Sequence, residues 1–251
     1  MNHDHTVSCV AIQAETLNNL AYTRIPFILG EANSLYKQGK PGLSNTFGAA
    51  LWGIDFNLWC ASVGIRRVHM HQGTGYRYIS WQPINTTREV IGTRAPYYGN
   101  IAVAAMLGNP SAGDVQILNI QLPNTTEAAY AAYVDKKLAR ILVINMNEYN
   151  YTIGGQFGGA PNPVERPSKT YRFKLAQASG EAQIQRLLAN GSDAISGITW
   201  DGYSYNYELG NGKPVRLNNV TVGETAEVSG GVISVSVPDS SVAVLNVEGL
   251  T

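Results

Sequence analysis

Glu31 is the residue of this sequence best placed to do chemistry. It follows the apolar residues 27–29 and precedes a polar, glycine-bearing stretch that reaches Gly42. An apolar run bounded by Pro26 and Gly30 predicts a short buried strand, and α/β barrels place catalytic groups where such strands end. Two interpretations of Glu31 stay open on this pattern. It is either a catalytic carboxylate, or a side chain that caps or ion-pairs with the helix that follows.

A second group of candidate residues begins at His71, where a loop dense in glycine and aromatic residues runs over 72–83. Aromatic faces stack on the CH groups of sugars, and glycine lets backbone N–H groups approach an anion. A phosphate-binding role for residues 73–75 is disfavoured because no GxGxxG motif and no P-loop lysine follow. The loop therefore favours sugar binding.

The elements that position these residues follow from the spacing of apolar side chains. It predicts helices over residues 7–22, 44–63 and 95–107, and strands over residues 25–31 and 65–71. The helix between the two strands implies a crossover that makes the strands parallel. Glu31 and His71 would then end neighbouring strands at the same carboxyl edge, the ligand-binding side of α/β folds.

The third of these helices is expected to turn Tyr97, Ile101, Ala105 and Met106 inward. After this helix the composition of the sequence changes. Residues 108–113 have the composition of a linker, and short β-type runs follow as far as residue 247. Many short strands at this spacing indicate an all-β sandwich. We therefore predict an α/β part over residues 1–108 and a β-sandwich domain over residues 109–251.

The composition of the chain disfavours several classes of binding partner. The chain has 251 residues, a formal net charge of zero and only 14% charged residues, so nothing suggests a nucleic-acid partner. No apolar run reaches the roughly 18–20 residues that a membrane span needs. The pattern His3-Asp4-His5 has no further ligand nearby and is typical of an ordinary polar terminus, so no metal site and no cofactor are predicted.

Secretion is indicated by five N-x-Ser/Thr sequons, although no signal peptide is visible in the first residues. The sequons start at Asn85, Asn124, Asn150, Asn190 and Asn219. Five together favour an extracellular glycoprotein.

The two cysteines, Cys9 and Cys60, lie in stretches predicted to be helical. They are equally compatible with one disulfide bond and with a pair of buried thiols.

Two strings of residues carry a family resemblance. The segment Gly30-Glu31-Ala32-Asn33-Ser34, followed by Gly39 through Trp52, closely resembles glycoside hydrolase family 79, which includes β-glucuronidases and heparanase-like enzymes. The match continues through the His71-Gln72-Gly73-Thr74-Gly75-Tyr76 loop and, less specifically, through a C-terminal β-domain to the end of the chain. It therefore covers nearly the whole sequence.

The resemblance implies a role for each candidate residue. Glu31 matches the family nucleophile at the end of the seventh strand of a TIM-type barrel, and residues 65–71 match the eighth strand. Tyr36, Gly75 and Tyr76 match positions that recognise the carboxylate of a uronic acid through tyrosines and backbone N–H groups. His71 either lines the sugar pocket or is a barrel-core histidine bonded to a backbone carbonyl.

The sequence departs from the family in one respect. The acid/base glutamate of these enzymes lies on the fourth strand, upstream of Met1, and a retaining glycosidase needs both carboxyl groups. The other carboxylates of the first half are Asp4, Glu15, Asp55 and Glu89, and none stands at a predicted strand end.

The predicted fold is thus the last two βα units of a barrel followed by a β-sandwich. We expect the barrel remnant alone to be poorly stable and catalytically inactive, whereas the sandwich could fold by itself. The resemblance implies the C-terminal part of a retaining hydrolase of β-linked glucuronides, acting on a uronic-acid-containing glycan, with the missing barrel portion as a partner. The alternative is a non-catalytic carbohydrate-binding or interaction module.

Overall fold

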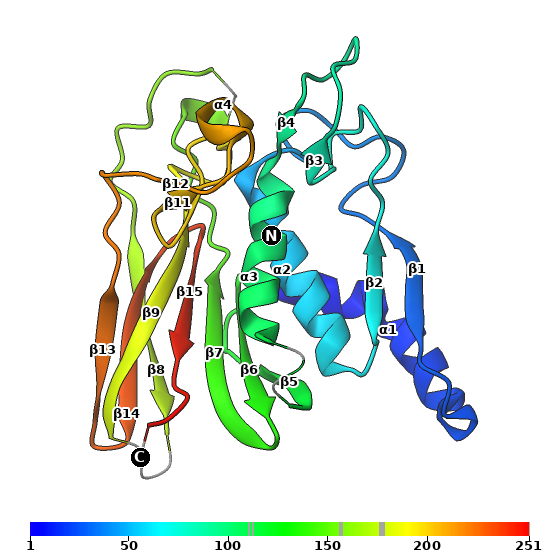
Figure 1. The fold of residues 1–251 in the computed structure, drawn as a ribbon, viewed down its shortest axis with the longest axis vertical. Helices are drawn as coiled ribbons and strands as arrows, with labels where there is room; N and C mark the ends of the chain where they lie inside the picture. Colours follow the sequence, from blue (N-terminus) through cyan, green and yellow to red (C-terminus); the bar gives the residue numbers. More distant parts are fainter. Residues whose placement is uncertain (110, 112, 156–157, 176–178, 251) are drawn as a thin grey trace.

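The computed structural model describes residues 1–109, 111, 113–155, 158–175 and 179–250. The helices are α1 (His3–Asn19), α2 (Phe47–Ser62), α3 (Ala95–Leu107) and the single turn α4 (Tyr207–Gly210), with 3-10 turns at Ala21–Thr23 and Ile153–Gly155. None of the helices among these described residues is long and apolar enough to cross a membrane. The three long helices lie in the first part of the chain together with four short strands, and strands dominate the rest (Figure 1).

The strands form one large sheet and two small pairs. They are β1 (Ile28–Ala32), β2 (Arg67–Met70), β3 (Trp81–Gln82), β4 (Gly92–Thr93), β5 (Val115–Ile120), β6 (Glu127–Val134), β7 (Lys137–Asn145), β8 (Ser168–Lys174), β9 (Gly180–Leu188), β10 (Thr199–Trp200), β11 (Tyr203–Ser204), β12 (Val215–Arg216), β13 (Glu224–Ser229), β14 (Val232–Pro238) and β15 (Ser241–Asn246).

The predicted parallel crossover is confirmed. Strands β1 and β2 pair in parallel, with Ile28 opposite Arg67 and Leu29 opposite Val68, and α2 connects them. The ladder continues past β2, because the backbone N–H of His71 donates to the carbonyl oxygen of Ala32 over 3.0 Å. Glu31 and His71 therefore stand at the same edge of this small sheet.

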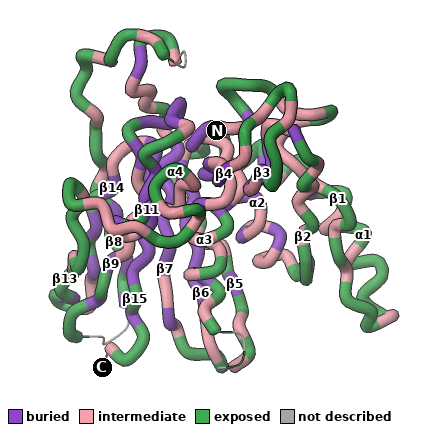
Figure 2. Tube along the Cα trace, turned by 45° about the horizontal axis from the view of Figure 1, so that its top comes forward, coloured by how far each residue is buried: buried purple, intermediate pink, exposed green. Residues whose placement is uncertain are grey.

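The prediction that β1 is a buried strand is wrong. Its residues are exposed or half-buried and none is buried, and Ile28 is 44% exposed. One face, which includes Leu29 and Val68, packs on a cluster built around Val10 and Phe56. The opposite face meets solvent, as the green and pink tube of β1 and β2 shows in Figure 2. A two-stranded sheet has no further strand to cover its edges, so this part is not a closed barrel, and its origin in a TIM-type barrel stays a prediction.

Helices α2 and α3 form a layer between the β1–β2 pair and the large sheet (Figure 1). Residues from α2, such as Leu51 and Ile54, share one core with Tyr130 of β6 and Leu142 of β7. Helix α3 has the predicted bounds but a different buried face. Tyr98, Ala102 and Met106 are buried, whereas of the residues expected inward only Met106 is. The close approach of α3 to α2 at Gly99 determines which face of α3 is buried. The sequence pattern does not reveal this approach.

The all-β character of the second half is confirmed, with one correction to its arrangement. The strands belong to a single antiparallel sheet rather than to two separate ones. Strand β9 pairs with β15 on one side and with β13 and β10 on the other. The sheet curls so that β8 and β14 face β7 and β15 across a second apolar core that includes Val143, Ile233 and Leu245.

The domain division after residue 108 stays a prediction. The core described above joins α2 and α3 to the large sheet, so residues on both sides of that boundary pack together. Residues 110 and 112 of the predicted linker lie outside the described part of the chain.

Candidate functional site

Three aromatic side chains gather in the loop that follows β2. The rings of His71 and Tyr76 are stacked, with centroids 5.2 Å apart and planes inclined by 19°. Tyr78 stands nearly perpendicular to both, 5.9 Å from His71 and 5.7 Å from Tyr76. Such edge-to-face and offset contacts are favourable aromatic geometries. The loop therefore presents an ordered aromatic cluster beside the end of β1.

Glycine at position 73 makes this cluster possible. A Cβ atom on Gly73 would stand 2.5 Å from Cε2 of Tyr76 and 2.7 Å from Cε1 of His71, so any larger residue would push the two rings apart. The N–H of Gly73 donates to Nδ1 of His71 over 3.2 Å. That nitrogen also lies 3.3 Å from the hydroxyl of Tyr78. His71 is thus held by the backbone amide of Gly73, with the Tyr78 hydroxyl close to the same nitrogen, and no bond from its ring to a backbone carbonyl is found among the described residues.

Glu31 points its carboxylate into solvent at the end of β1. It is exposed, and within the described residues its side chain makes no hydrogen bond or ion pair. The residue before α2 is Thr46, and no side chain caps that helix. The capping interpretation of Glu31 is therefore wrong. Burial raises the pKa of Tyr78, and the neighbouring Tyr76 and Glu31 add to this shift. The charge of Glu31 therefore acts on Tyr78, one member of the aromatic cluster.

The other predicted binding residues are less well gathered. Tyr36 is 76% exposed, and its ring contacts the ammonium group of Lys37 at 5.5 Å. The N–H of Gly75 donates to Oε1 of Gln82 over 2.9 Å, and the N–H of Tyr76 donates to the carbonyl oxygen of Gly73 over 3.0 Å. Both amides predicted to bind a carboxylate are therefore engaged within the chain.

Tyr78 is a residue of the site that sequence reasoning missed. Its hydroxyl donates to the carbonyl oxygen of Lys37 over 2.9 Å, and the N–H of Arg77 donates to the carbonyl oxygen of Gln38 over 2.8 Å. These bonds join the loop after β2 to the loop after β1. The only local signal is the Tyr-x-Tyr spacing of residues 76–78, which does not distinguish a ligand platform from a brace.

Glu89 is a second missed residue. Its carboxylate lies 2.6 Å from the guanidinium of Arg77 and 3.0 Å from that of Arg94. Arg77 also donates to the carbonyl oxygen of Gly75 over 3.3 Å. Hydrogen bonds between a guanidinium and a carboxylate are stronger than hydrogen bonds between neutral groups, and they fix the geometry of the two side chains. Glu89 thus braces the loop that carries Tyr76, and its carboxylate is already occupied.

Within the described residues, no group of three or more His, Cys, Asp or Glu side chains is arranged to hold a metal ion. Cys9 and Cys60 are free thiols, the first exposed and the second buried. Burial, reinforced by the nearby charge of Asp55, raises the pKa of Cys60 to about 12. The disulfide alternative is therefore wrong. The alternative of two buried thiols is wrong for Cys9, which is exposed, and Cys60 alone is an unreactive core thiol.

Comparison with known proteins gives a family match and two close relatives. Residues 129–244 match the model of the glycosyl hydrolase family 79 C-terminal beta domain. A beta-glucuronidase of Aspergillus niger is 55% identical over 98% of this chain and 46% of its own length. One from Neurospora crassa is 49% identical over 88% of this chain and 44% of its own length. The chain spans about half the length of the curated relatives it matches.

Two solved structures share the fold. A 4-O-α-L-rhamnosyl-β-D-glucuronidase from Fusarium oxysporum 12S, in complex with Rha-GlcA, superposes with a TM-score of 0.79 at 24% identity, over 98% of this chain and 49% of its own. A family 51 arabinofuranosidase from Xanthomonas axonopodis pv. citri gives a TM-score of 0.56 at 13% identity, over 98% of this chain and 46% of its own. The family resemblance noted in the sequence is confirmed. The chain thus resembles a C-terminal portion of glycosyl hydrolase family 79 proteins, and its residues 129–244 match that family's C-terminal beta domain.

Proposed function

We propose that this chain supplies the nucleophile side of a retaining site that hydrolyses β-linked glucuronides. One observation carries the proposal: the carboxylate of Glu31 is unpaired within the described residues and stands at the carboxyl edge of a parallel strand pair, beside the stacked His71 and Tyr76. The names of the two relatives, both beta-glucuronidases, support the choice of substrate class.

In the proposed reaction, the carboxylate of Glu31 attacks the anomeric carbon of the glucuronide. The bond from that carbon to the aglycone oxygen breaks, and a second carboxyl group gives its proton to the leaving oxygen. The same second group then takes a proton from water, which attacks the anomeric carbon, releases glucuronic acid and frees Glu31. An exposed carboxylate that has no hydrogen-bond partner among the described residues suits the first of these roles.

The second carboxyl group is proposed to come from protein outside this chain. It must lie about 5–5.5 Å from the nucleophile. Asp4 and Glu15 are on α1, Asp55 is fully buried against Tyr130, and Glu89 is held by two arginines. We propose as partner the barrel portion that the resemblance implies, because among the described residues the outer edges of β1 and β2 have no neighbouring strand.

We propose that Tyr36, Tyr76, Gly75 and His71 surround the sugar, with the uronate carboxylate near Tyr36 and Tyr76. The N–H of Gly75 would bind that carboxylate only after releasing Gln82. Stacking of His71 on Tyr76 keeps the Tyr76 ring in one orientation, which favours recognition by a preformed surface.

Binding at this edge can be tested on the chain itself by ¹H–¹⁵N NMR with methyl β-D-glucuronide. We expect shifts at residues 71–78 in the wild type, and binding weakened at least about tenfold in Gly73→Ala, whose Cβ would separate His71 from Tyr76. Gly30→Ala is the matched control, because nothing lies within 4 Å of its added Cβ. Tyr76→Leu serves if Gly73→Ala does not fold. Binding that is unchanged in Tyr76→Leu, or absent from the wild type, would contradict the assignment.

Secretion and N-glycosylation also stay proposals. Of the five sequon asparagines, Asn85, Asn124, Asn190 and Asn219 are exposed. The side chain of Asn150 is half-buried and donates to Glu148 over 2.6 Å. We therefore propose the four exposed positions as acceptors. Protein secreted by a eukaryotic host that shows no mass loss after enzymatic deglycosylation would refute this.

A further inference from the structure

The uronate carboxylate of the proposed substrate needs a donor beyond the backbone amides of the candidate site. The N–H groups of Gly75 and Tyr76 are already bonded to other groups of the chain. A uronate would also bring a second carboxylate to the edge that carries Glu31, and like charges disfavour such an approach. A cation at this edge would supply a donor and offset the repulsion.

Lys37 carries a cation that is free to take this role. Arg77 and Arg94 are both engaged by the carboxylate of Glu89, over 2.6 and 3.0 Å. No ion pair to the ammonium group of Lys37 is found within the described part of the chain. This group instead lies 5.5 Å from the centroid of the Tyr36 ring. Because Tyr36 is proposed to bind the uronate, the ammonium group is already beside the position proposed for that carboxylate.

The backbone of Lys37 is joined to the aromatic cluster. Its carbonyl oxygen accepts from the hydroxyl of Tyr78 over 2.9 Å, and the carbonyl oxygen of Gln38 accepts from the N–H of Arg77 over 2.8 Å. The ring of Tyr78 packs edge-on against that of His71. These bonds hold Lys37 against the loop after β2, so a ligand bound at the cluster is within reach of its long side chain.

The backbone conformation of Lys37 is unusual for a lysine. Its φ is +59°, in the left-handed region that glycine and asparagine adopt more readily than other residues. Backbone strain of this kind gathers at functional sites. A lysine at a position that favours a smaller residue is consistent with a role for its side chain.

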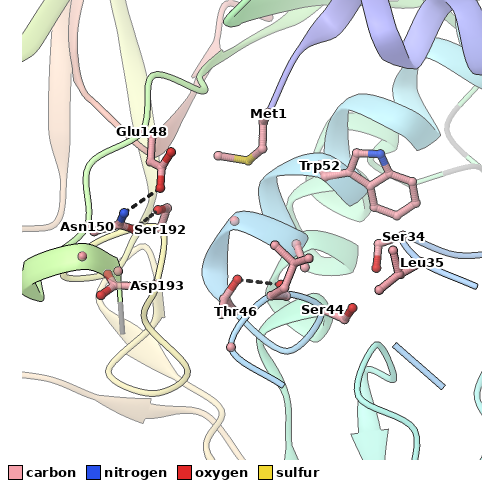
Figure 3. Close-up of a pocket in the computed structure, with 16 residues that line it drawn as sticks. Met1, Ser34, Leu35, Ser44, Thr46, Trp52, Glu148, Asn150, Ser192 and Asp193 are labelled. Atoms are coloured by element: carbon pink, nitrogen blue, oxygen red, sulfur yellow. Dashed lines mark hydrogen bonds between the residues drawn. The ribbon is translucent and has the colours of Figure 1, made fainter. Parts of the chain in front are cut away.

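The residues just before Lys37 show where the loop turns outward. Ser34 and Leu35 line a hollow together with Trp52 of α2 (Figure 3), and all three are half-buried. Tyr36 and Lys37 are exposed and do not line this hollow. The loop is therefore packed at its base, and it presents the Tyr36 ring and the Lys37 ammonium group to solvent.

On the basis of the proposed function, we propose that Lys37 is a specificity-determining residue, whose ammonium group binds the uronate carboxylate together with the hydroxyl of Tyr36. A bond between an ammonium group and a carboxylate is stronger than one between neutral groups. A neutral glycoside has a hydroxymethyl group in place of this carboxylate and gains no ion pair. Lys37 therefore favours uronides over neutral glycosides.

The proposal is tested by ¹H–¹⁵N NMR titration of the chain with methyl β-D-glucuronide and methyl β-D-glucoside, which differ only at C6. Lys37→Asn removes the ammonium group and keeps a residue that tolerates the left-handed backbone. We expect it to weaken glucuronide binding about five- to tenfold and to leave the weaker glucoside binding unchanged. Lys37→Arg should retain most of the glucuronide affinity, because it keeps the charge. Lys40→Asn, at another exposed lysine of the same loop, is the matched control.

Glucuronide affinity that is the same in Lys37→Asn and in the wild type would overturn the proposal. An equal loss of glucoside affinity would also overturn it, because it would indicate a structural role for Lys37, and so would an equal loss of glucuronide affinity in Lys40→Asn. Failure of the proposed function would register differently. The glucuronide would then shift none of residues 71–78 in the wild type, and both proposals would be refuted.

Discussion

Replacing Gly99 with alanine is expected to lower the free energy of unfolding by about 2–3 kcal/mol. A Cβ atom at this position of α3 would stand 2.7 Å from the carbonyl oxygen of Ala50 and 3.3 Å from its Cα. Both are backbone atoms of α2, so no side chain can move aside and the two helices must separate. The helix propensity of alanine, about 0.8–1 kcal/mol better than that of glycine, opposes this loss but is smaller.

Gly53→Ala is the matched control, because it makes the same change in α2 where nothing lies within 4 Å of the added Cβ. There we expect only the propensity gain, a stabilisation of up to about 1 kcal/mol. Urea unfolding followed by circular dichroism measures both variants against the wild type. If Gly99→Ala is as stable as the wild type, the close packing of α3 on α2 is incorrect.

The second large effect concerns His3, which anchors α1 to α2. Its Nδ1 lies 2.8 Å from Oδ1 of Asp55, a fully buried carboxylate that also accepts from the hydroxyl of Tyr130 over 2.7 Å. The hydrogen bond to Asp55 raises the pKa of His3 above 6.5; burial lowers it by less, and the charges of Asp55 and Asp4 add to the rise. Trp59 and Asn119 complete the surroundings of the ring.

Since the folded pKa is raised, the stabilisation from His3 is fully present below pH 6.5 and is lost as pH rises through the folded value. At pH 6 we expect His3→Gln to be less stable than the wild type by about 1–3 kcal/mol, the cost of removing a partner from a buried charge. At pH 9 the difference should shrink, because neutral imidazole retains only a hydrogen bond. His5→Gln, exposed on the same helix, is the control. Stability differences that stay constant from pH 6 to 9 would refute this assignment.

Local signals in the sequence explain which elements could be predicted. Pro96 and Gly108 mark the two ends of α3, and its bounds agree with the prediction. The parallel order of β1 and β2 follows from the helix length between them. The buried face of α3 could not be chosen, because the helix is apolar nearly all round, from Tyr97 and Tyr98 to Met106.

Of the candidate site, only the residues at the ends of the two strands could be placed from the sequence. Glu31 and His71 were placed at one edge from the order of the elements, and the structure has them there. The contacts of Tyr78 with Lys37 and of Glu89 with Arg77 join residues from different loops, so no local pattern indicates them. The exposure of β1 escaped prediction for a related reason: burial of a strand depends on neighbouring strands, not on its own composition.

The most direct test of the central claim is hydrolysis of an aryl β-glucuronide by this chain, with and without a polypeptide that supplies the part of the Aspergillus niger relative that the chain does not match. We predict no turnover by the chain alone, turnover when the two polypeptides are combined, and its loss in a combination that carries Glu31→Gln. Turnover by the chain alone, or turnover of the combined polypeptides that survives Glu31→Gln, would contradict the account.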